Sequence, residues 1–160
     1  MTQRFIPIGM ALALILASAV AAANPPAQMG GWEKEGAYNR LYKATELDRI
    51  KVVVERLEEI VPVAGMAPAT ALVVKEEDSP SPIIVHICPA WYMKASDTGI
   101  KKGDELKIRG AWAEIGGKDV FMASKIKRGE HFNLKVRLTK DGTPFWTMTP
   151  EQQAQEKEAD

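Results

Sequence analysis

The sequence predicts an all-β fold: a five-stranded Greek-key barrel with a short helix after the third strand and an added C-terminal hairpin. Three observations predict it. Short segments of alternating apolar residues are separated by Gly-, Pro- and Asp-containing turns, one Pro-started helical segment interrupts them, and the strictest alternation comes late, over 132–139. A small antiparallel barrel closed on itself has this pattern.

The first three strands precede the helical segment. Residues 45–62, with the β-branched run 51–55, predict a long first strand with a bulge near 56–58, where the alternation breaks. Residues 69–75 predict the second strand and 83–88 the third, which is apolar on both faces and so needs cover on both. Pro89 then starts a helical turn, and a helix between strands three and four is the arrangement of an OB-fold.

The second half of the chain has clear turn signals. The fourth strand begins at 105, and 111–115 and 118–123 form a hairpin across Gly116-Gly117. The alternation over 132–139 is the best strand signal in the chain. Residues 143–147 predict a short final strand, which Pro144 places at an edge.

Residues 1–23 have the pattern of a secretory signal peptide. A polar start with one positive charge precedes an apolar run over 5–20 and the small-residue site Ala21-Ala22-Ala23. The run is short and contains Pro7 and Gly9, which disfavours a membrane anchor. We therefore expect a periplasmic or secreted protein with no membrane insertion after the signal is removed.

The remaining chain divides into three parts: an aromatic arm over 24–44, an OB-fold-like barrel over 45–148 and a polar tail over 149–160. The arm carries Trp32, Tyr38 and Tyr42, too many large rings for a free segment, so we expect it to cover the outer face of a strand. The tail is rich in Gln and Glu, which predicts a frayed or weakly helical end.

The charge is balanced overall and uneven locally. The chain has 21 Lys and Arg against 21 Asp and Glu, which makes nucleic acid an unlikely partner. Residues 99–140, however, carry 11 basic and 5 acidic side chains. This block could form a surface stripe for an acidic partner, or it could be the solvated faces of strands, which alternation alone explains.

The motifs of enzymes are missing from the sequence, and we expect a protein that is not an enzyme. The two His residues, His86 and His131, have no nucleophile motif nearby. There is no phosphate-binding or dinucleotide-binding Gly pattern and no Cys-x-x-Cys-His for covalent haem.

A metal or haem site is a sharper alternative. His86 and Cys88 stand two apart on one strand, hence on one face, and Met93 follows across the Pro89 turn. An imidazole, a thiolate and a thioether suit copper or an axial haem position. The competing interpretation is that Cys and Met fill the core.

A binding surface for a protein partner is the interpretation that we favour. Strands two and three of such barrels bind ligands with their outer face and flanking loops. The candidate contacts are Trp32, Tyr38, Tyr42, His86, Trp91 and Tyr92. Oligosaccharide or nucleic acid is the alternative class of ligand, since rings and basic residues serve both.

Several motifs together resemble a known family. They are Met29-Gly30-Gly31-Trp32, Tyr38-Asn39-Arg40-Leu41-Tyr42, His86-x-x-Pro89-Ala90-Trp91-Tyr92, Gly103-Asp104-x-Leu106-x-Ile108-x-Gly110 and Ala123-Ser124-x-Ile126-x-x-Gly129. The combination resembles small exported bacterial OB-fold proteins, related to magnetosome-associated and multihaem-cytochrome-associated OB-fold proteins. The resemblance implies export, an accessory role in a redox or metal-handling system, and a partner such as a c-type cytochrome. It implies no established reaction, and Cys88 stands where the pattern has Gly.

Overall fold

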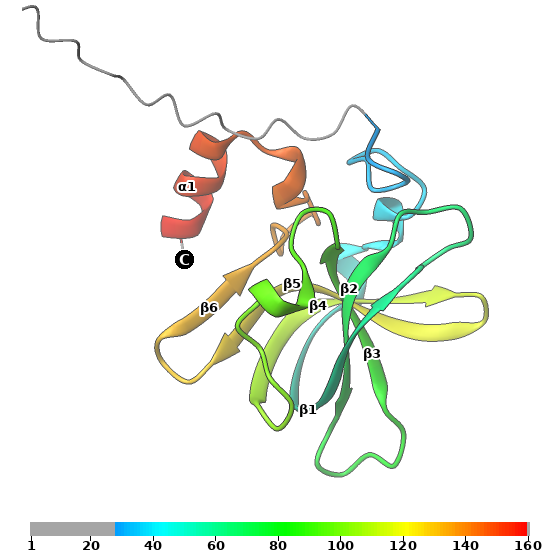
Figure 1. The fold of residues 1–160 in the computed structure, drawn as a ribbon, viewed down its shortest axis with the longest axis vertical. Helices are drawn as coiled ribbons and strands as arrows, with labels where there is room; N and C mark the ends of the chain where they lie inside the picture. The colour runs from blue at the N-terminus through cyan, green and yellow to red at the C-terminus, as the bar shows by residue number, and fades with distance from the viewer. Residues whose placement is uncertain (1–27, 160) are drawn as a thin grey trace, which may run out of the picture.

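The computed structural model describes residues 28–159, so the expected signal peptide lies outside the described residues. The strands are β1 (Leu47–Ile60), β2 (Ala69–Lys75), β3 (Ile83–Pro89), β4 (Glu105–Ile115), β5 (Lys118–Arg128) and β6 (Phe132–Lys135). They form one sheet in the order β3-β2-β1-β4-β5-β6, and β3 also pairs with β5 (Figure 1). Strands β1 to β5 therefore close into a ring, which confirms the all-β, barrel-like fold.

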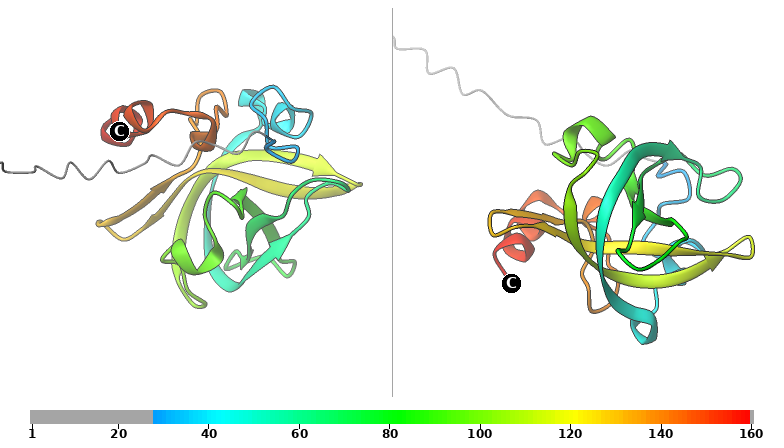
Figure 2. Two further views of the ribbon diagram at one scale, coloured as in Figure 1. Left: turned by 45° about the horizontal axis from the view of Figure 1, so that its top comes forward. Right: turned by 90° about the horizontal axis from the view of Figure 1, so that it is seen from below.

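The ring is closed by one parallel contact and several antiparallel ones. Val85 and His86 of β3 pair with Phe121 and Met122 of β5 in parallel, whereas the other pairings are antiparallel. Seen from below, the strands wrap around a common interior (Figure 2), which buried apolar side chains fill. β6 pairs with β5 outside the ring and leads to the C-terminal segment.

β1 is long because it must reach two neighbours. Its first half pairs with β4 and its second half with β2. Ile50, Val52 and Val54 face the core, as the alternation predicts. The register shifts between Val54 and Arg56, so the bulge is at Glu55, just before the expected position.

The β4–β5 hairpin turns at the predicted pair of glycines. Gly116 and Gly117 have φ of 59° and 76°, the left-handed conformation that a type I′ hairpin turn needs at both of its central positions. A second irregularity lies in the hairpin, where the register shifts between Arg109 and Gly110. Ser124 of β5 is the extra residue at this register shift. Because of it, the positions of β5 whose side chains face outward differ on the two sides of the bulge.

The segment after β3 forms two short helical pieces. The amides of Tyr92 and Met93 both donate to the carbonyl of Pro89, which gives the expected helical turn. A 3-10 helix, Ala95–Asp97, follows it. Two further 3-10 helices, Asn39–Leu41 and Ala44–Glu46, lie in the N-terminal arm.

Two strand boundaries predicted late in the chain are wrong. β6 ends at Lys135, because the amides of Val136 and Arg137 both donate to the carbonyl of Ser124 and the alternation stops there. The predicted strand over 143–147 is a single bridge between Arg137 and Pro144 followed by the 3-10 helix Phe145–Thr147. A 3-10 turn lets the neighbouring rings of Phe145 and Trp146 both enter the core, which strand alternation would prevent.

The expected polar tail is a regular helix, α1 (Pro150–Glu158). Thr149 caps it with a reciprocal pair of hydrogen bonds to Gln152. Its far end lies beside the β5–β6 hairpin, where Lys135 Nζ donates to the carbonyl oxygens of Glu156 and Ala159 at 2.9 and 2.7 Å. No helix within residues 28–159 has the length and apolarity to cross a membrane.

Candidate functional site

The predicted binding residues separate into a buried group and an exposed pair. Trp32, Tyr38, Tyr42 and His86 are at most 6% exposed. Trp91 is 37% exposed and Tyr92 is half-buried. The arm therefore lies over the barrel as expected, but its rings form part of the core and leave Trp91 as the exposed ring of the predicted set.

The arm covers β3 through one polar contact. The Tyr38 hydroxyl and His86 Nδ1 are 2.9 Å apart, and their rings stack with centroids 6.0 Å apart. Burial lowers the pKa of His86 to about 4, and the nearby charge of Arg137 acts in the same direction. Burial also raises the pKa of Tyr38 to about 12. Both groups are therefore neutral near pH 7.

Cys88 is a buried, protonated thiol. Burial raises its pKa to about 12, and Sγ lies 3.7 Å from the carbonyl oxygen of Met93. The same carbonyl accepts a hydrogen bond of 2.6 Å from Thr70 Oγ1 on β2. Met93 thus meets Cys88 through its backbone oxygen.

Arg137 is of a residue type that is common in binding sites, and no sequence pattern singled it out. It is 1% exposed, and the rings of Tyr38, Tyr42 and Trp146 surround its guanidinium with centroids 5.9, 6.0 and 4.7 Å from Cζ. Nη1 donates to Asn39 Oδ1. Within residues 28–159, Nε and Nη2 have no hydrogen-bond partner. Burial lowers the pKa of Arg137.

This arrangement does not fit the copper or haem site considered above. The positive charge of Arg137 would repel a metal ion at this position, just as it already disfavours a proton on His86. A thiolate ligand would need Cys88 to lose a proton held with a pKa of about 12. Within the described chain, no three His, Cys, Asp or Glu side chains form a group that could hold a metal ion.

The exposed edge around Trp91 joins three segments. Trp91 Nε1 lies 3.4 Å from the carbonyl oxygen of Met29 at the start of the arm. The neighbouring Ala90 amide donates to Pro68, in the loop between β1 and β2. The same loop presents Val61 and Val63, both exposed apolar residues. Sequence reasoning pointed to Trp91 but not to these valines.

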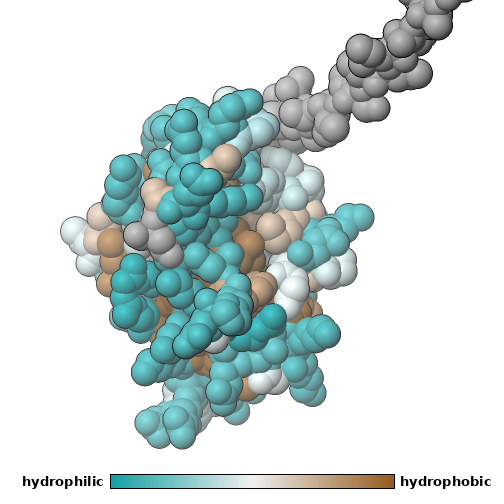
Figure 3. Space-filling model, turned by 90° about the vertical axis from the view of Figure 1, so that its left-hand side faces the viewer, coloured by the Kyte–Doolittle hydropathy of each residue, from teal (hydrophilic) through white to brown (hydrophobic). Residues whose placement is uncertain are grey.

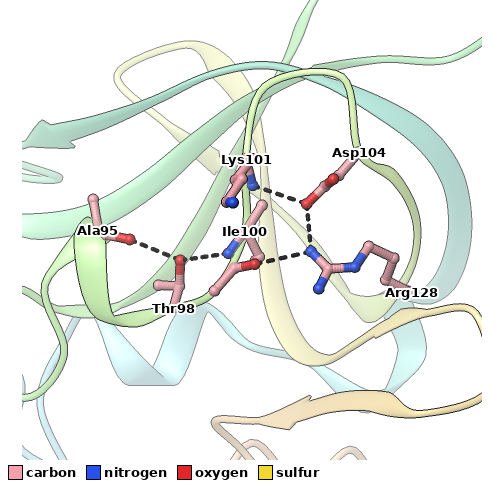
Figure 4. A network of polar contacts seen from close by, with 7 residues as sticks. Ala95, Thr98, Ile100, Lys101, Asp104 and Arg128 are labelled. Atoms are coloured by element: carbon pink, nitrogen blue, oxygen red, sulfur yellow. Dashed lines mark hydrogen bonds and ion pairs between the residues drawn. The ribbon is translucent and has the colours of Figure 1, made fainter.

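The loop before β4 is held by a polar network. Arg128 of β5 donates from Nη1 to the carbonyl of Gly99 at 2.8 Å and to Asp104 Oδ2 at 2.5 Å, and Asp104 also accepts from the Lys101 amide (Figure 4). Thr98 closes the other end, bonding to Ala95 and Ile100. These partners fix Arg128 in a structural role.

The fold and the packed interior define a small, barrel-like, all-β protein. Residues 46–133 match the MamS/MamX magnetosome protein family, and the chain belongs to this family. A search of curated proteins and a search of solved structures each found no match.

Proposed function

We propose that this chain is an exported, non-catalytic OB-fold accessory protein that docks a protein partner of a periplasmic redox or metal-handling system. A c-type cytochrome is the partner class that we propose, by analogy with the cytochrome-associated OB-fold proteins that the sequence motifs resemble. Export rests on the signal-like pattern over 1–23. The OB-fold assignment is supported by the five-strand ring with β3 parallel to β5.

The observation that carries this proposal is the contrast between the interior and the edge at Trp91. The groups most capable of chemistry, His86 and Cys88, are buried, neutral and engaged with Tyr38 and Met93. Trp91 instead presents a large ring to solvent, and its neighbour Ala90 is hydrogen-bonded to the β1–β2 loop, which carries the exposed valines. Exposed Trp next to apolar residues is typical of protein-docking surfaces. We therefore place the docking edge at Trp91, Val61 and Val63, with Tyr92 packing behind it.

Site-specific photo-crosslinking in the native host tests this proposal. A photoreactive phenylalanine analogue replaces Trp91 in one strain and Lys118, in the β4–β5 turn, in a control strain. Position 91 should give one discrete cross-linked product, whose partner is identified by mass spectrometry and stained for covalent haem. No product at position 91, or the same products from both positions, would contradict the proposed docking edge.

A further inference from the structure

Cations of four neighbouring strands lie side by side on the outer face of the sheet. The pairing register places Arg49 of β1, Arg109 of β4, Lys125 of β5 and Lys135 of β6 in one row, in which Lys125 is largely buried. The next row, two residues along each strand, holds Lys51, Lys107, Lys127 and Asn133. We call these two rows the cationic grid. Directly paired residues project from the same face of a sheet.

The cationic grid should lower the stability of the folded protein, because it places like charges next to one another. Residues directly opposite in an antiparallel pair have Cβ atoms about 5 Å apart, and like charges there are destabilising. Arg49 faces Arg109, and Lys107 faces both Lys51 and Lys127. The side chains of Arg49, Lys51, Lys107 and Arg109 form no ion pair with any residue in 28–159. Strand alternation explains why these four side chains are exposed. It does not explain why the residues paired with them on neighbouring strands also carry a positive charge.

The grid lies on a hollowed surface. A depression of about 460 Å³ is lined by basic side chains: Arg49, Lys107, Arg109, Lys125 and Lys127. An adjoining depression of about 230 Å³ continues past Lys135 to Lys140 and the end of α1. At the opposite end, Glu77, Glu105 and Glu130 border the grid. The side of the molecule that carries β6 and α1 is mainly hydrophilic (Figure 3).

We propose that the cationic grid binds an acidic polypeptide segment, rich in Asp and Glu. The protein already makes a contact of this kind at one end of the grid. There Lys135 Nζ donates to two carbonyl oxygens at the end of α1. A helix C-terminus carries partial negative charge, and residues 141–160 hold five acidic side chains against one basic. Lys135 therefore already binds polypeptide oxygens at this end of the grid.

Nucleic acid fits the grid less well. Proteins that hold single strands combine basic grooves with exposed aromatic rings on which bases stack. Among the described residues the large exposed aromatic side chain is Trp91, which follows β3 and is not in the grid. The grid is thus separate from the docking edge, and its ligand class does not depend on the function proposed above.

A binding titration tests the grid. The probe is a fluorescent peptide of about eight glutamates, long enough to cross four strands spaced about 4.8 Å apart. The grid variant is Arg49→Gln, Lys107→Gln, Arg109→Gln. The matched control, Lys94→Gln, Lys102→Gln, Lys118→Gln, removes the same charge from exposed positions outside the grid. We expect the grid variant to bind at least about tenfold more weakly at low salt, and the control and Trp91→Ala to bind like the wild type.

Urea unfolding accompanies each titration, because the grid variant should be at least as stable as the wild type once like charges are removed. If it does not fold, Lys51→Gln with Lys107→Gln replaces it under the same criteria. Equal weakening in the control, or no binding of the peptide by the wild type, would overturn the proposal. Tighter binding of an oligothymidylate of matched charge would overturn the assignment to polypeptide.

Discussion

Tyr38 and His86, 48 positions apart in the chain, are joined by a hydrogen bond of 2.9 Å. This contact fastens the N-terminal arm to the strand that closes the barrel. It also occupies Nδ1 of His86, one of the two ring nitrogens through which an imidazole can bind a metal. The buried side of β3 is therefore a structural interface, and candidate binding surfaces lie elsewhere on the molecule.

Stability should fall in acid because of His86. Burial lowers its folded pKa from 6.5 to about 4, so between these values the unfolded chain binds more protons than the folded one. The penalty begins as the pH falls through 6.5, is complete near 4, and amounts to at most about 3 kcal/mol. Urea unfolding across this range measures it. His86→Gln should flatten the pH dependence, and the exposed control His131→Gln should retain it.

Arg137→Ala should destabilise the protein by about 3 kcal/mol, because it removes a buried side chain that three aromatic rings and Asn39 surround. Urea unfolding followed by Trp fluorescence measures this, since Trp146 is buried beside Arg137 and Trp32 packs against Trp146. The exposed control Arg40→Ala should change stability by less than about 0.5 kcal/mol. A similar small effect for Arg137→Ala would show that the cluster does not hold the arm.

Cys88 should resist alkylation in the folded protein. Its thiol is fully buried, and the rise in pKa from 9.0 to about 12 lowers the thiolate fraction about a thousandfold. Iodoacetamide labelling followed by mass spectrometry, with and without denaturing urea, measures the rates. Rapid labelling without urea would mean that the arm opens readily over β3.

Gly110→Ala should destabilise the β4–β5 hairpin. A Cβ at this position would lie 2.1 Å from the carbonyl oxygen of Met122, at the bulge where the strands approach closely. The strands would have to separate, at a cost of about 3 kcal/mol. A melting temperature within the error of the wild type would contradict the close approach.

Local patterns predict much of this fold. Alternation and β-branched residues predicted β1 to β5, and Gly116-Gly117 predicted the hairpin turn, because both signals act within a few residues. The burial of the arm followed from its content of large rings.

The remaining features depend on contacts between distant segments. The extra residue at Ser124 and the end of β6 at Lys135 change the outward-facing positions. Arg137, which the alternation over 132–139 would place on the outward face with Lys135, is therefore buried. The cationic grid needs the pairing register of four strands, although the excess of basic residues over 99–140 was visible in the sequence. His86, Cys88 and Met93 matched a ligand set by spacing, but only the structure places Arg137 beside them.

Hydrogen–deuterium exchange tests most directly the claim that the arm seals β3. The amides of Leu41 and Tyr42, which donate to Tyr38 and Asn39, should exchange slowly, together with those of β3. Protection of both segments to the same extent would agree with a sealed interior and a function confined to the outer surface. Exchange of the arm within seconds, while β3 stays protected, would contradict it and return His86 and Cys88 to consideration as a ligand site.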